Sequence, residues 1–506
     1  MPRRLLIGSR LIIQRAETCP SQSGAAVKRS LSLANRSQCV FFESSSVAGG
    51  QIGHLSTPKS FPLRFHLFCR SLCVRAVARF APSHSLLNMK HLLRLGRTST
   101  RSFPGCPSHS PFLRYSLNAT WQRCYSAWQP PSRSEGLPDI DASKLTVTKT
   151  ANSKQLLPPK ELIFGSTFTD HMLQVNWNTK DGWLAPEIIP YQNLSLDPAT
   201  CVFHYAFECF EGMKAYKGKD GSIRLFRPDK NMARLNKSSK RIALPTFDGN
   251  TMIKLIGELV KLDSRFIPQP TMIGTQKTLG VSPPGSAMLF VIASPVGPYY
   301  PTGFKAVSLE ATDYAVRAWP GGVGDKKLGA NYAPCIVPQL EASTRGFQQN
   351  LWLFGEEQYL TEVGTMNLFI ALKNKETGQN ELITPPLDGT ILEGVTRDSV
   401  LTLGRERLSP KGWKVHERKI TMAEIAQAAD EGRLIEVFGA GTAAIVSPVR
   451  NISWKGRLVD CGLKKDEEAG KVALDMKNWI EGIQYGEEDH PWRFRFALGG
   501  VNYRPR

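Results

Sequence analysis

The chain has 506 residues, and 64 Lys and Arg against 44 Asp and Glu give it a formal net charge of +20. This length exceeds that of one ordinary hydrophobic core and predicts two domains with additional material. The sequence contains no run of 18 apolar residues, which argues against a transmembrane helix and a membrane partner.

The basic charge is concentrated in the first quarter of the chain. Residues 1–125 contain 18 Lys and Arg but two acidic residues, whereas the remainder has a net charge of +4. A nearly balanced body removes the main argument for a nucleic-acid partner. The leader is rich in Arg and Ser, with apolar residues between the arginines, as in MPRRLLIGSRLIIQRA. This composition is typical of a mitochondrial presequence and predicts a location in the mitochondrial matrix.

The boundaries of this leader have more than one interpretation. Residues 123–127 resemble a processing site, and Met89 is a second candidate start that would leave residues 1–88 untranslated. The alternative is a basic tail that is never cleaved. Residues 126–150 are rich in Pro and Ser, and we expect a disordered arm there.

We expect residues 151–298 to form a small N-terminal domain. Strand-like runs at 171–177 and 182–191 are separated by NTKDG, a hairpin signal. Apolar residues at helical spacing predict helices over 231–244 and 251–262, and 287–294 again has the pattern of a strand.

The stretch 294–305 contains three prolines and two glycines and marks a connection, placed over 299–310, to a larger C-terminal cofactor domain predicted over 311–506. We expect strands at 350–355, 359–363, 367–372, 434–439 and 442–449, and helices at 396–408, 421–433 and 466–482. Thr421 and Glu424 form a capping-box pattern at the start of the second of these helices. The chain is therefore predicted to be α/β (α+β), in two domains and without internal repeats.

Four segments of the body place a polar group among small residues. In GGVGDKKLGANY, Lys326 and Lys327 lie among glycines, which let the backbone approach a ligand closely. The alternative is a flexible surface loop, and no phosphate-binding GxxxxGK[ST] pattern fits. In TEVGTMN, Glu362 ends a strand, where it can serve a ligand or be merely solvated.

The other two segments are candidate anion sites. In LEGVTRDSV, Gly394, Val395 and Thr396 precede a helix, so that free N–H groups at the helix start and a hydroxyl can bind an anion, although Thr396 can also be an ordinary cap. FGAGTAAIV matches the GxGxxA dinucleotide pattern. The β-branched residues and Pro448 that follow leave no room for the required helix. Thr442 and the glycine loop can still hold a phosphate.

An aldehyde cofactor with a phosphate would use all four segments. A lysine forms an imine with the aldehyde, and a carboxylate at a pyridine nitrogen keeps the ring protonated and electron-accepting. Thr396, Thr442 and backbone N–H groups would then hold the phosphate.

These residues lie in motifs that resemble the branched-chain amino acid aminotransferases, which are fold-type IV pyridoxal 5′-phosphate enzymes. The similarity extends over residues 164–492 and includes HYAFECFEGMKAYKG, VRAWPGGVGDKKLGANY, TEVGTMNLF and FGAGTAAIV. It implies the two-domain fold of that group, pyridoxal 5′-phosphate as cofactor and a homodimer. It also implies transfer of the amino group of leucine, isoleucine or valine to 2-oxoglutarate, the last step of branched-chain biosynthesis and the first of catabolism.

The resemblance implies a role for each matching residue. Lys327 would be the catalytic Schiff-base residue, Tyr332 would bond the phenolic oxygen of the cofactor, and Glu362 would face its ring nitrogen. Arg234 would hold the phosphate together with Val395, Thr396 and Thr442. The substrate pocket would be formed by Phe164, Tyr205, Tyr299, Thr365 and Ala443, with Leu279 and Val281 reaching in from the partner subunit. No metal site is expected, because Cys201, Cys209, Cys335 and Cys461 of the body are far apart in sequence.

One departure from the family pattern concerns the substrate entrance. The family has a Tyr-x-Arg-Pro segment before the PTMIGT stretch, whereas this chain passes from Gln269 directly to Pro270. An error in the gene model or in splicing is one explanation of this gap; if the deletion is real, we expect weak or absent activity despite an intact cofactor site. An inert homologue, retained as a subunit, is the alternative from another class. D-amino-acid aminotransferases and aminodeoxychorismate lyases share the fold, but EVGTMNLF and SPVGPYY argue against both.

Overall fold

The computed structural model describes residues 134–155, 157–158, 161–163, 165–263, 267–295 and 304–496. The chain divides into two units, 1–109 and 110–506, and every described residue lies in the second. The leader predicted over 1–125 is outside the described residues. Phe164, Tyr299 and residues 299–303 of the predicted connection are outside them as well.

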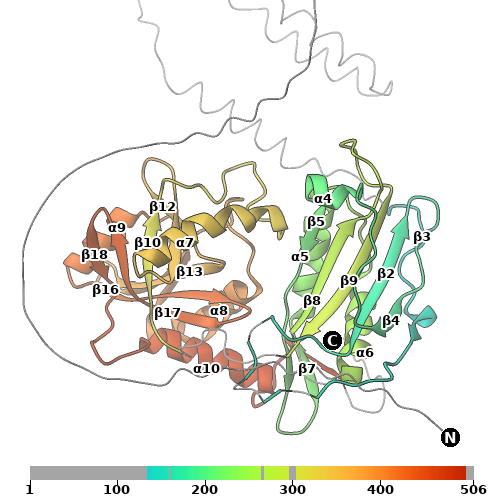
Figure 1. Ribbon diagram of the computed structural model, residues 1–506. Helices are drawn as coiled ribbons and strands as arrows, with labels where there is room; N and C mark the ends of the chain where they lie inside the picture. Colours follow the sequence, from blue (N-terminus) through green and yellow to red (C-terminus); the bar gives the residue numbers. More distant parts are fainter. Residues whose placement is uncertain are drawn as a thin grey trace, which may run out of the picture. The chain divides into compact units, whose positions relative to one another are not determined.

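The N-terminal half contains a seven-stranded sheet in the order β1-β4-β2-β9-β8-β5, with β3 paired to β2 (Figure 1). Its strands are β1 (Thr146–Val147), β2 (His171–Asn178), β3 (Gly182–Trp183), β4 (Glu187–Pro190), β5 (Glu208–Phe210), β8 (Ile267–Gly274) and β9 (Ser286–Ser294). The single strand predicted over 182–191 is wrong, because β3 and β4 pair with β2 separately. Pro186, between them, has no N–H to continue a ladder.

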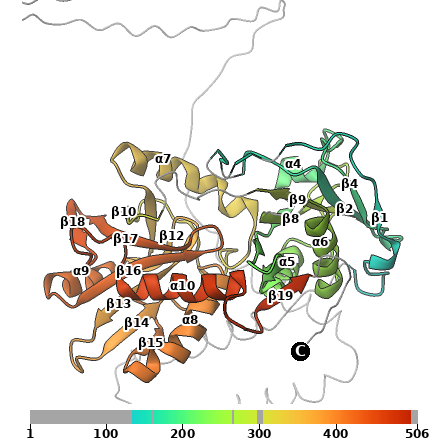
Figure 2. The same cartoon turned by 90° about the horizontal axis from the view of Figure 1, so that it is seen from below.

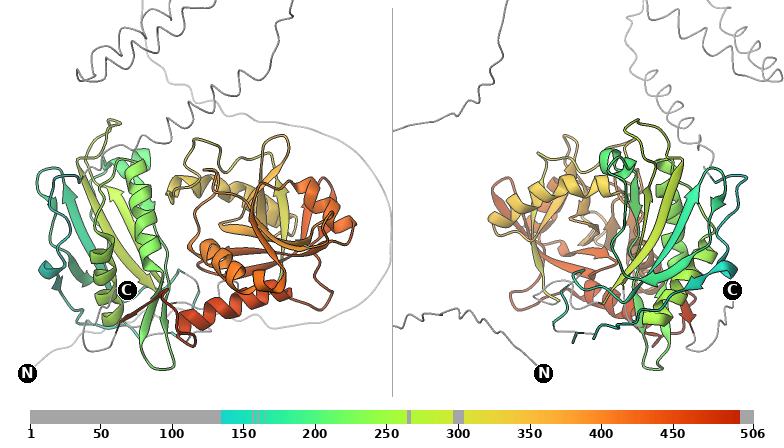
Figure 3. Two further views of the ribbon diagram at one scale, coloured as in Figure 1. Left: turned by 180° about the vertical axis from the view of Figure 1, so that it is seen from behind. Right: turned by 45° about the vertical axis from the view of Figure 1, so that its right-hand side comes forward.

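Two helices cover one face of this sheet (Figure 3). They are α5 (Pro228–Arg241) and α6 (Gly249–Asp263), which confirm the two predicted helices, and the short α4 (Cys201–Tyr205) precedes them. β9 alternates between buried and half-buried residues, so one side chain in two faces the core. Leu235 and Ile256 of the helices pack there with Val175 and Leu289 of the sheet, all with no exposed surface.

The described part of the arm predicted to be disordered is structured. Residues Ala142–Lys144 form a 3-10 helix, and β1 pairs in parallel with β4. Ile140 is buried in the N-terminal core, and the N–H of Thr150 donates to Nε2 of His171 at 2.9 Å. The Pro and Ser content predicted disorder because it does not reveal these contacts. Together they bury side chains and satisfy backbone groups, which orders the segment.

The C-terminal half contains a nine-stranded sheet in the order β12-β11-β10-β17-β16-β13-β14-β15, with β18 paired to β17. Because β12 also pairs with β13, the first six strands close into a ring. The strands are β10 (Val307–Thr312), β11 (Gln349–Phe354), β12 (Tyr359–Val363), β13 (Met366–Lys373), β14 (Asn380–Thr384), β15 (Lys414–Glu417), β16 (Leu434–Gly441), β17 (Ile445–Trp454) and β18 (Arg457–Asp460).

The helices of this half are α7 (Ile336–Thr344), α8 (Val395–Arg407), α9 (Met422–Asp430) and α10 (Lys471–Tyr485). Figure 2 shows α8 and α10 on the strands of the C-terminal sheet. At α9, the hydroxyl of Thr421 accepts from the N–H of Glu424 at 3.1 Å, which confirms that side of the predicted capping box.

Helix α10 begins five residues after the predicted start at 466, and a buried carboxylate explains the difference. Glu436 of β16 accepts hydrogen bonds from the N–H groups of Val472 (2.6 Å) and Ala473 (3.0 Å) in the first turn. This contact fixes where the helix starts, because those N–H groups have no partner within the helix. The burial of Glu436 raises the pKa of its carboxyl group.

A small sheet joins the two halves of the chain. β19 (Arg493–Phe496), near the C-terminus, pairs with β7 (Ile223–Phe226), which also pairs with β6 (Ala215–Lys217). In the described ranges, no helix is both long enough and apolar enough to cross a membrane.

Candidate functional site

One pocket collects most of the predicted site residues. Segments from both halves line it: the end of β5, helix α5, strand β8, the lysine segment, the start of α8 and the turn between β16 and β17. Eight predicted residues line this pocket: Arg234, Lys327, Tyr332, Thr365, Val395, Thr396, Thr442 and Ala443. The prediction that these separate segments form one site is therefore consistent with the geometry.

The segment that carries the lysine is fixed by β5 and α5. The N–H of Phe210 donates to the carbonyl of Lys327 at 3.1 Å, and the N–H of Lys327 donates to Ser238 Oγ at 2.9 Å. Two residues on, the N–H of Gly329 donates to the carboxylate of Glu208 at 2.7 Å. A Cβ at Gly329 would collide with that carboxylate, so glycine is required for this close approach.

The Lys327 amine is directed into the pocket by aromatic neighbours. Its Nζ donates to the hydroxyl of Tyr332 at 2.9 Å and lies 4.5 Å from the centroid of the Phe210 ring. A lysine amine held in this way can reach a small molecule in the pocket, which the alternative of a flexible surface loop does not explain.

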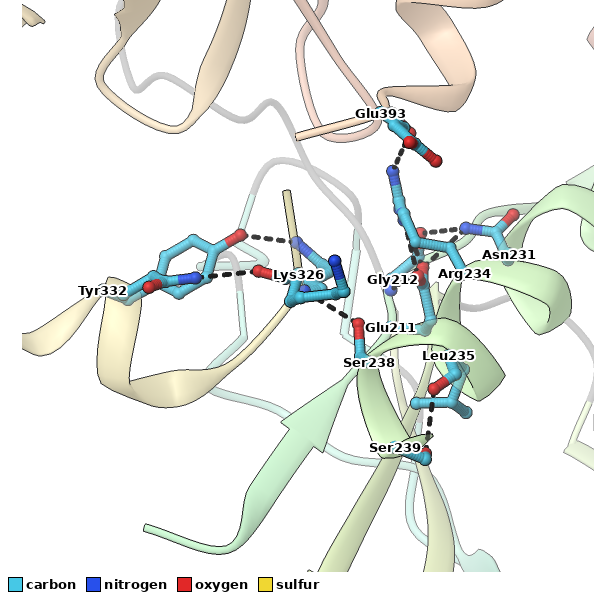
Figure 4. Close-up of polar contacts among 12 residues, drawn as sticks. Glu211, Gly212, Asn231, Arg234, Leu235, Ser238, Ser239, Lys326, Tyr332 and Glu393 are labelled. Atoms are coloured by element: carbon cyan, nitrogen blue, oxygen red, sulfur yellow. Dashed lines mark hydrogen bonds and ion pairs between the residues drawn. The ribbon is translucent and has the colours of Figure 1, made fainter. Parts of the chain in front are cut away.

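Helix α5 directs a set of polar side chains toward the site (Figure 4). Asn231, Arg234 and Ser238 are three and four residues apart and therefore share one face of the helix. Arg234 donates to both oxygens of Glu211, at 2.7 and 2.9 Å, and to the carbonyl of Glu393 at 2.8 Å. Glu211 has no exposed surface, and Asn231 bonds it at 2.7 Å. The guanidinium is thus held in one orientation at the wall of the pocket.

The start of α8 and the turn between β16 and β17 provide an anion site next to Arg234. The first N–H groups of a helix have no intrahelical acceptor, and Val395 and Thr396, at the start of α8, both line the pocket. Thr442 adds a second hydroxyl from the turn. A guanidinium, a helix N-terminus and two hydroxyls are a donor set that fits a phosphate group.

The glycine loop is part of a hairpin. Gly441 pairs with Ile445, so that β16 leads directly into β17 and no helix follows the GxGxxA pattern. The interpretation that this pattern is not a dinucleotide site is confirmed by that topology.

Glu362 lies one layer behind the pocket wall. It is 2% exposed, its Oε2 is 2.9 Å from Arg317, and its Oε1 accepts from the N–H of Leu392 at 2.6 Å. Leu392 and Asn367, which also bonds Glu362, line the pocket. Burial raises the pKa of the Glu362 carboxyl group, and the nearby Arg317 opposes that shift. The alternative of a solvated carboxylate is wrong.

Three predicted substrate residues do not line the pocket. Tyr205 is 37% exposed and contacts the carbonyl of Leu279, while Leu279 and Val281 are 64% and 75% exposed. Phe164 and Tyr299 are outside the described residues. Within the described ranges, no group of three or more His, Cys, Asp or Glu side chains is placed to hold a metal ion.

Several residues of the site were not identified from the sequence. Phe210 and Glu211 lie in the HYAFECFEGMKAYKG motif, which was a signal for the region without a role for either residue. Arg317 lies in the VRAWPGGVGDKKLGANY motif, but its role was missed because its ion pair with Glu362 joins residues far apart in the chain.

We expect Arg317→Met to lower the free energy of unfolding by about 3–5 kcal/mol, because it leaves the buried Glu362 carboxylate without its cation. Without the arginine, the pKa of Glu362 in the folded protein rises further above its ordinary value of 4.5. The unfolded chain then binds fewer protons than the folded one, so stability falls as the pH rises above that value. Urea denaturation at about pH 5 and about pH 8 measures this, with the larger loss at the higher pH.

The matched control is Arg345→Met. Arg345 pairs with Glu310 at 2.6 Å and is 46% exposed, so its loss should leave the free energy of unfolding nearly unchanged. Equal losses for the two variants would contradict the importance of the buried pair.

Comparison with known proteins identifies the family. Residues 208–452 match amino-transferase class IV. The chain is 58% identical to the mitochondrial branched-chain-amino-acid aminotransferase of Saccharomyces cerevisiae, over 69% of this chain and 92% of that protein. It is 57% identical to the cytosolic enzyme of the same yeast, over 70% and 96%.

Solved structures agree with this match. The Escherichia coli branched-chain amino acid aminotransferase aligns with a TM-score of 0.54 at 22% identity, covering 65% of this chain and 99% of that one, which shows the same fold. The T.th. branched-chain amino acid aminotransferase, solved with pyridoxamine 5′-phosphate, gives a TM-score of 0.51 at 25% identity over 63% and 97%. The chain belongs to the branched-chain-amino-acid aminotransferases, within the class IV aminotransferases.

Proposed function

We propose that this chain transfers the amino group of leucine, isoleucine or valine to 2-oxoglutarate, with pyridoxal 5′-phosphate as cofactor and Lys327 as catalytic base. The observation that carries the proposal is the Lys327 amine, bonded to Tyr332, in one pocket with Arg234 and the start of α8. The names of the relatives, at 45–58% identity, support the reaction. The pyridoxamine 5′-phosphate in the structure of the T.th. enzyme supports the cofactor.

The residues of the pocket fit the parts of this cofactor. Arg234, the N–H groups of Val395 and Thr396 and the hydroxyls of Thr396 and Thr442 would hold its phosphate. Glu362, oriented by its ion pair with Arg317, would hold the proton on the ring nitrogen. When bound, pyridoxal phosphate supplies an electron-accepting ring and the carbon that takes up the amino group.

Lys327 would move the proton. Its Nζ would take the proton from Cα of the amino acid and return it to the cofactor carbon that takes up the amino group. This requires an amine on a flexible chain within the pocket. The hydroxyl of Tyr332, at 2.9 Å, orients that amine and can donate its own proton to the phenolic oxygen of the cofactor. Phe210 shields the amine from water on one side.

The substrate would lie against Thr365 and Ala443, which line the pocket. We include Phe164, Tyr205 and Tyr299 in the same wall, and Leu279 and Val281 from a partner subunit. The apolar and aromatic character of this set suits branched aliphatic side chains.

Turnover of L-leucine with 2-oxoglutarate, followed as glutamate formed by residues 126–506, tests the proposed reaction. We expect Lys327→Ala to lower kcat by at least about 10²-fold, because the base that moves the Cα proton is lost. Lys326→Ala is the matched control: Lys326 pairs with Asp325 at 2.5 Å and does not line the pocket. Wild-type protein that binds the cofactor but forms no glutamate would contradict the proposed function.

The junction at Gln269 gives a second prediction. Gln269 lines the pocket and offers a neutral amide where the family pattern has a cation. Inserting the family's Tyr-x-Arg segment between Gln269 and Pro270 should raise kcat/KM for 2-oxoglutarate by about tenfold or more, because an arginine can pair with the second carboxylate. Equal kinetic constants for the two chains would show that the missing segment is unimportant.

We propose that the chain forms a homodimer through the region around α4 and the β8–β9 connection. Phe203, Leu279 and Val281 are 60%, 64% and 75% exposed there, and clustered apolar side chains of this size usually meet another protein surface. A symmetric contact would bring Leu279 and Val281 to the partner's pocket, consistent with their position outside the pocket of their own chain.

Sedimentation velocity measures the assembly. We expect the wild-type chain to sediment as a dimer and Val281→Asp to shift it toward monomer, because a buried unpaired carboxylate disfavours the interface. Leu458→Asp, on β18 and 63% exposed, is the control and should leave the dimer intact. A monomeric wild-type chain would contradict the assignment.

We propose a mitochondrial matrix location, with residues 1–125 as the presequence. The basic, acid-poor composition of those residues supports it. The mitochondrial and cytosolic enzymes of S. cerevisiae match 69% and 70% of this chain at 58% and 57% identity, so these matches do not distinguish the two compartments.

A further inference from the structure

The turn between β16 and β17 has a backbone conformation that its sequence does not favour. Gly441 pairs with Ile445, which leaves residues 442–444 as the tip. Ile445 has φ +63°, in the left-handed region that glycine adopts easily and a β-branched residue rarely does. The turn is therefore strained and needs contacts from outside to hold it. Its tip supplies Thr442 and Ala443 to the pocket.

One contact of this kind comes from Lys214, in the segment between β5 and β6. The Nζ of Lys214 donates to the carbonyl of Ala443 at 2.5 Å. Fixing that carbonyl also fixes the peptide plane that follows it, because the peptide bond is rigid and trans. The segment with Lys214 also carries Glu211 and Gly212 of the pocket wall, so the contact ties the two walls together.

The environment of Lys214 is unfavourable for a cation. Burial lowers the pKa of its amine to about 8, and Glu481 of α10 opposes this only in part. Glu481 itself pairs with Lys477 at 2.6 Å, and Tyr485 lies near it with a pKa raised by burial. Among the described residues, no carboxylate lies within ion-pair distance of Lys214. The side chain of Lys214 is half-buried, so holding its charge against a carbonyl, without a carboxylate, lowers stability, and a neutral side chain there would avoid that loss.

We propose that Lys214 is a positioning residue that holds the strained β16–β17 turn in the shape that lines the cofactor pocket. The inference rests on the proposed function in treating this pocket as the cofactor site. Lys214 acts through Ala443 and Thr442 and does not touch the pocket itself.

As the pH rises, loss of the Lys214 charge weakens the hydrogen bond that holds the turn but raises the stability of the whole protein. Below about pH 8 the charged amine makes the stronger hydrogen bond to Ala443, and this hold weakens as the pH rises through that value. The ordinary pKa of 10.5 applies in the unfolded chain, which therefore binds more protons than the folded one between about 8 and 10.5. In that window the contribution of Lys214 to global stability rises with pH.

The variant Lys214→Met separates these effects, because methionine fills the space without a charge. In the wild-type holoenzyme and the variant, hydrogen exchange of amides 443–446 and the dissociation constant of pyridoxal phosphate are measured together with the melting temperature. At about pH 7 we expect both exchange at the turn and the dissociation constant to rise by about tenfold, with an unchanged or higher melting temperature. Lys217→Met, on β6 and exposed, should match the wild type.

Unchanged exchange at the turn together with unchanged cofactor affinity would overturn the proposal. Rapid hydrogen exchange throughout the Lys214→Met chain would mean that the variant is not folded, and the proposal is then tested on the wild-type protein by changing the pH. Between about pH 7 and about pH 9, exchange at the turn, corrected for its intrinsic pH dependence, should accelerate relative to the core, and a flat profile overturns the proposal. A wild-type protein that does not bind pyridoxal phosphate would contradict the proposed function, while the exchange result would still test Lys214.

Discussion

Glu211 is a carboxylate with no exposed surface, and the geometry of the pocket depends on how its charge is neutralised. Arg234 bonds both of its oxygens, and Asn231 adds a third hydrogen bond. A carboxylate without water is tolerated only with such partners, so neither side chain can rotate away. Because Arg234 also reaches the carbonyl of Glu393, just before α8, the pair fixes three elements at once. The anion site exists where these elements meet.

The same principle applies to a second buried carboxylate. Arg317 pairs with Glu362 behind the wall, which fixes the orientation of the carboxylate and opposes the rise in its pKa that burial causes. Lys214 differs from both, because its described partner is a carbonyl and not a charge. Glu211 and Glu362 are thus stabilised by ion pairs, whereas the charge of Lys214 lowers the stability of the folded protein. This contrast is the reason for assigning Lys214 a role beyond structure.

The sequence predicted those parts of the molecule that depend on local pattern. The helices α5 and α6 and the strands β2 and β13 follow from apolar periodicity, and Lys327, Thr396 and Thr442 follow from motifs. Parts that depend on distant contacts were missed. The start of α10 is set by Glu436, 36 residues before Val472, and the orientation of Arg234 by Glu211, 23 residues away. A single chain also leaves Leu279 and Val281 outside the pocket, where their predicted role requires a partner.

The junction at Gln269 leaves the pairing of β8 with β9 intact. β8 pairs with β9 without a register shift from Ile267 to Gly274, straight through the junction. Pro268 and Pro270 have no N–H, but their carbonyls accept from Met213 and Glu211 at 3.2 and 2.7 Å, so the strand still bonds on both sides. The charged residues that line the pocket are Glu211, Arg234 and Lys327. The first two neutralise each other and the third is the proposed base of the transfer, so the described wall offers a second carboxylate the amide of Gln269 and no free cation.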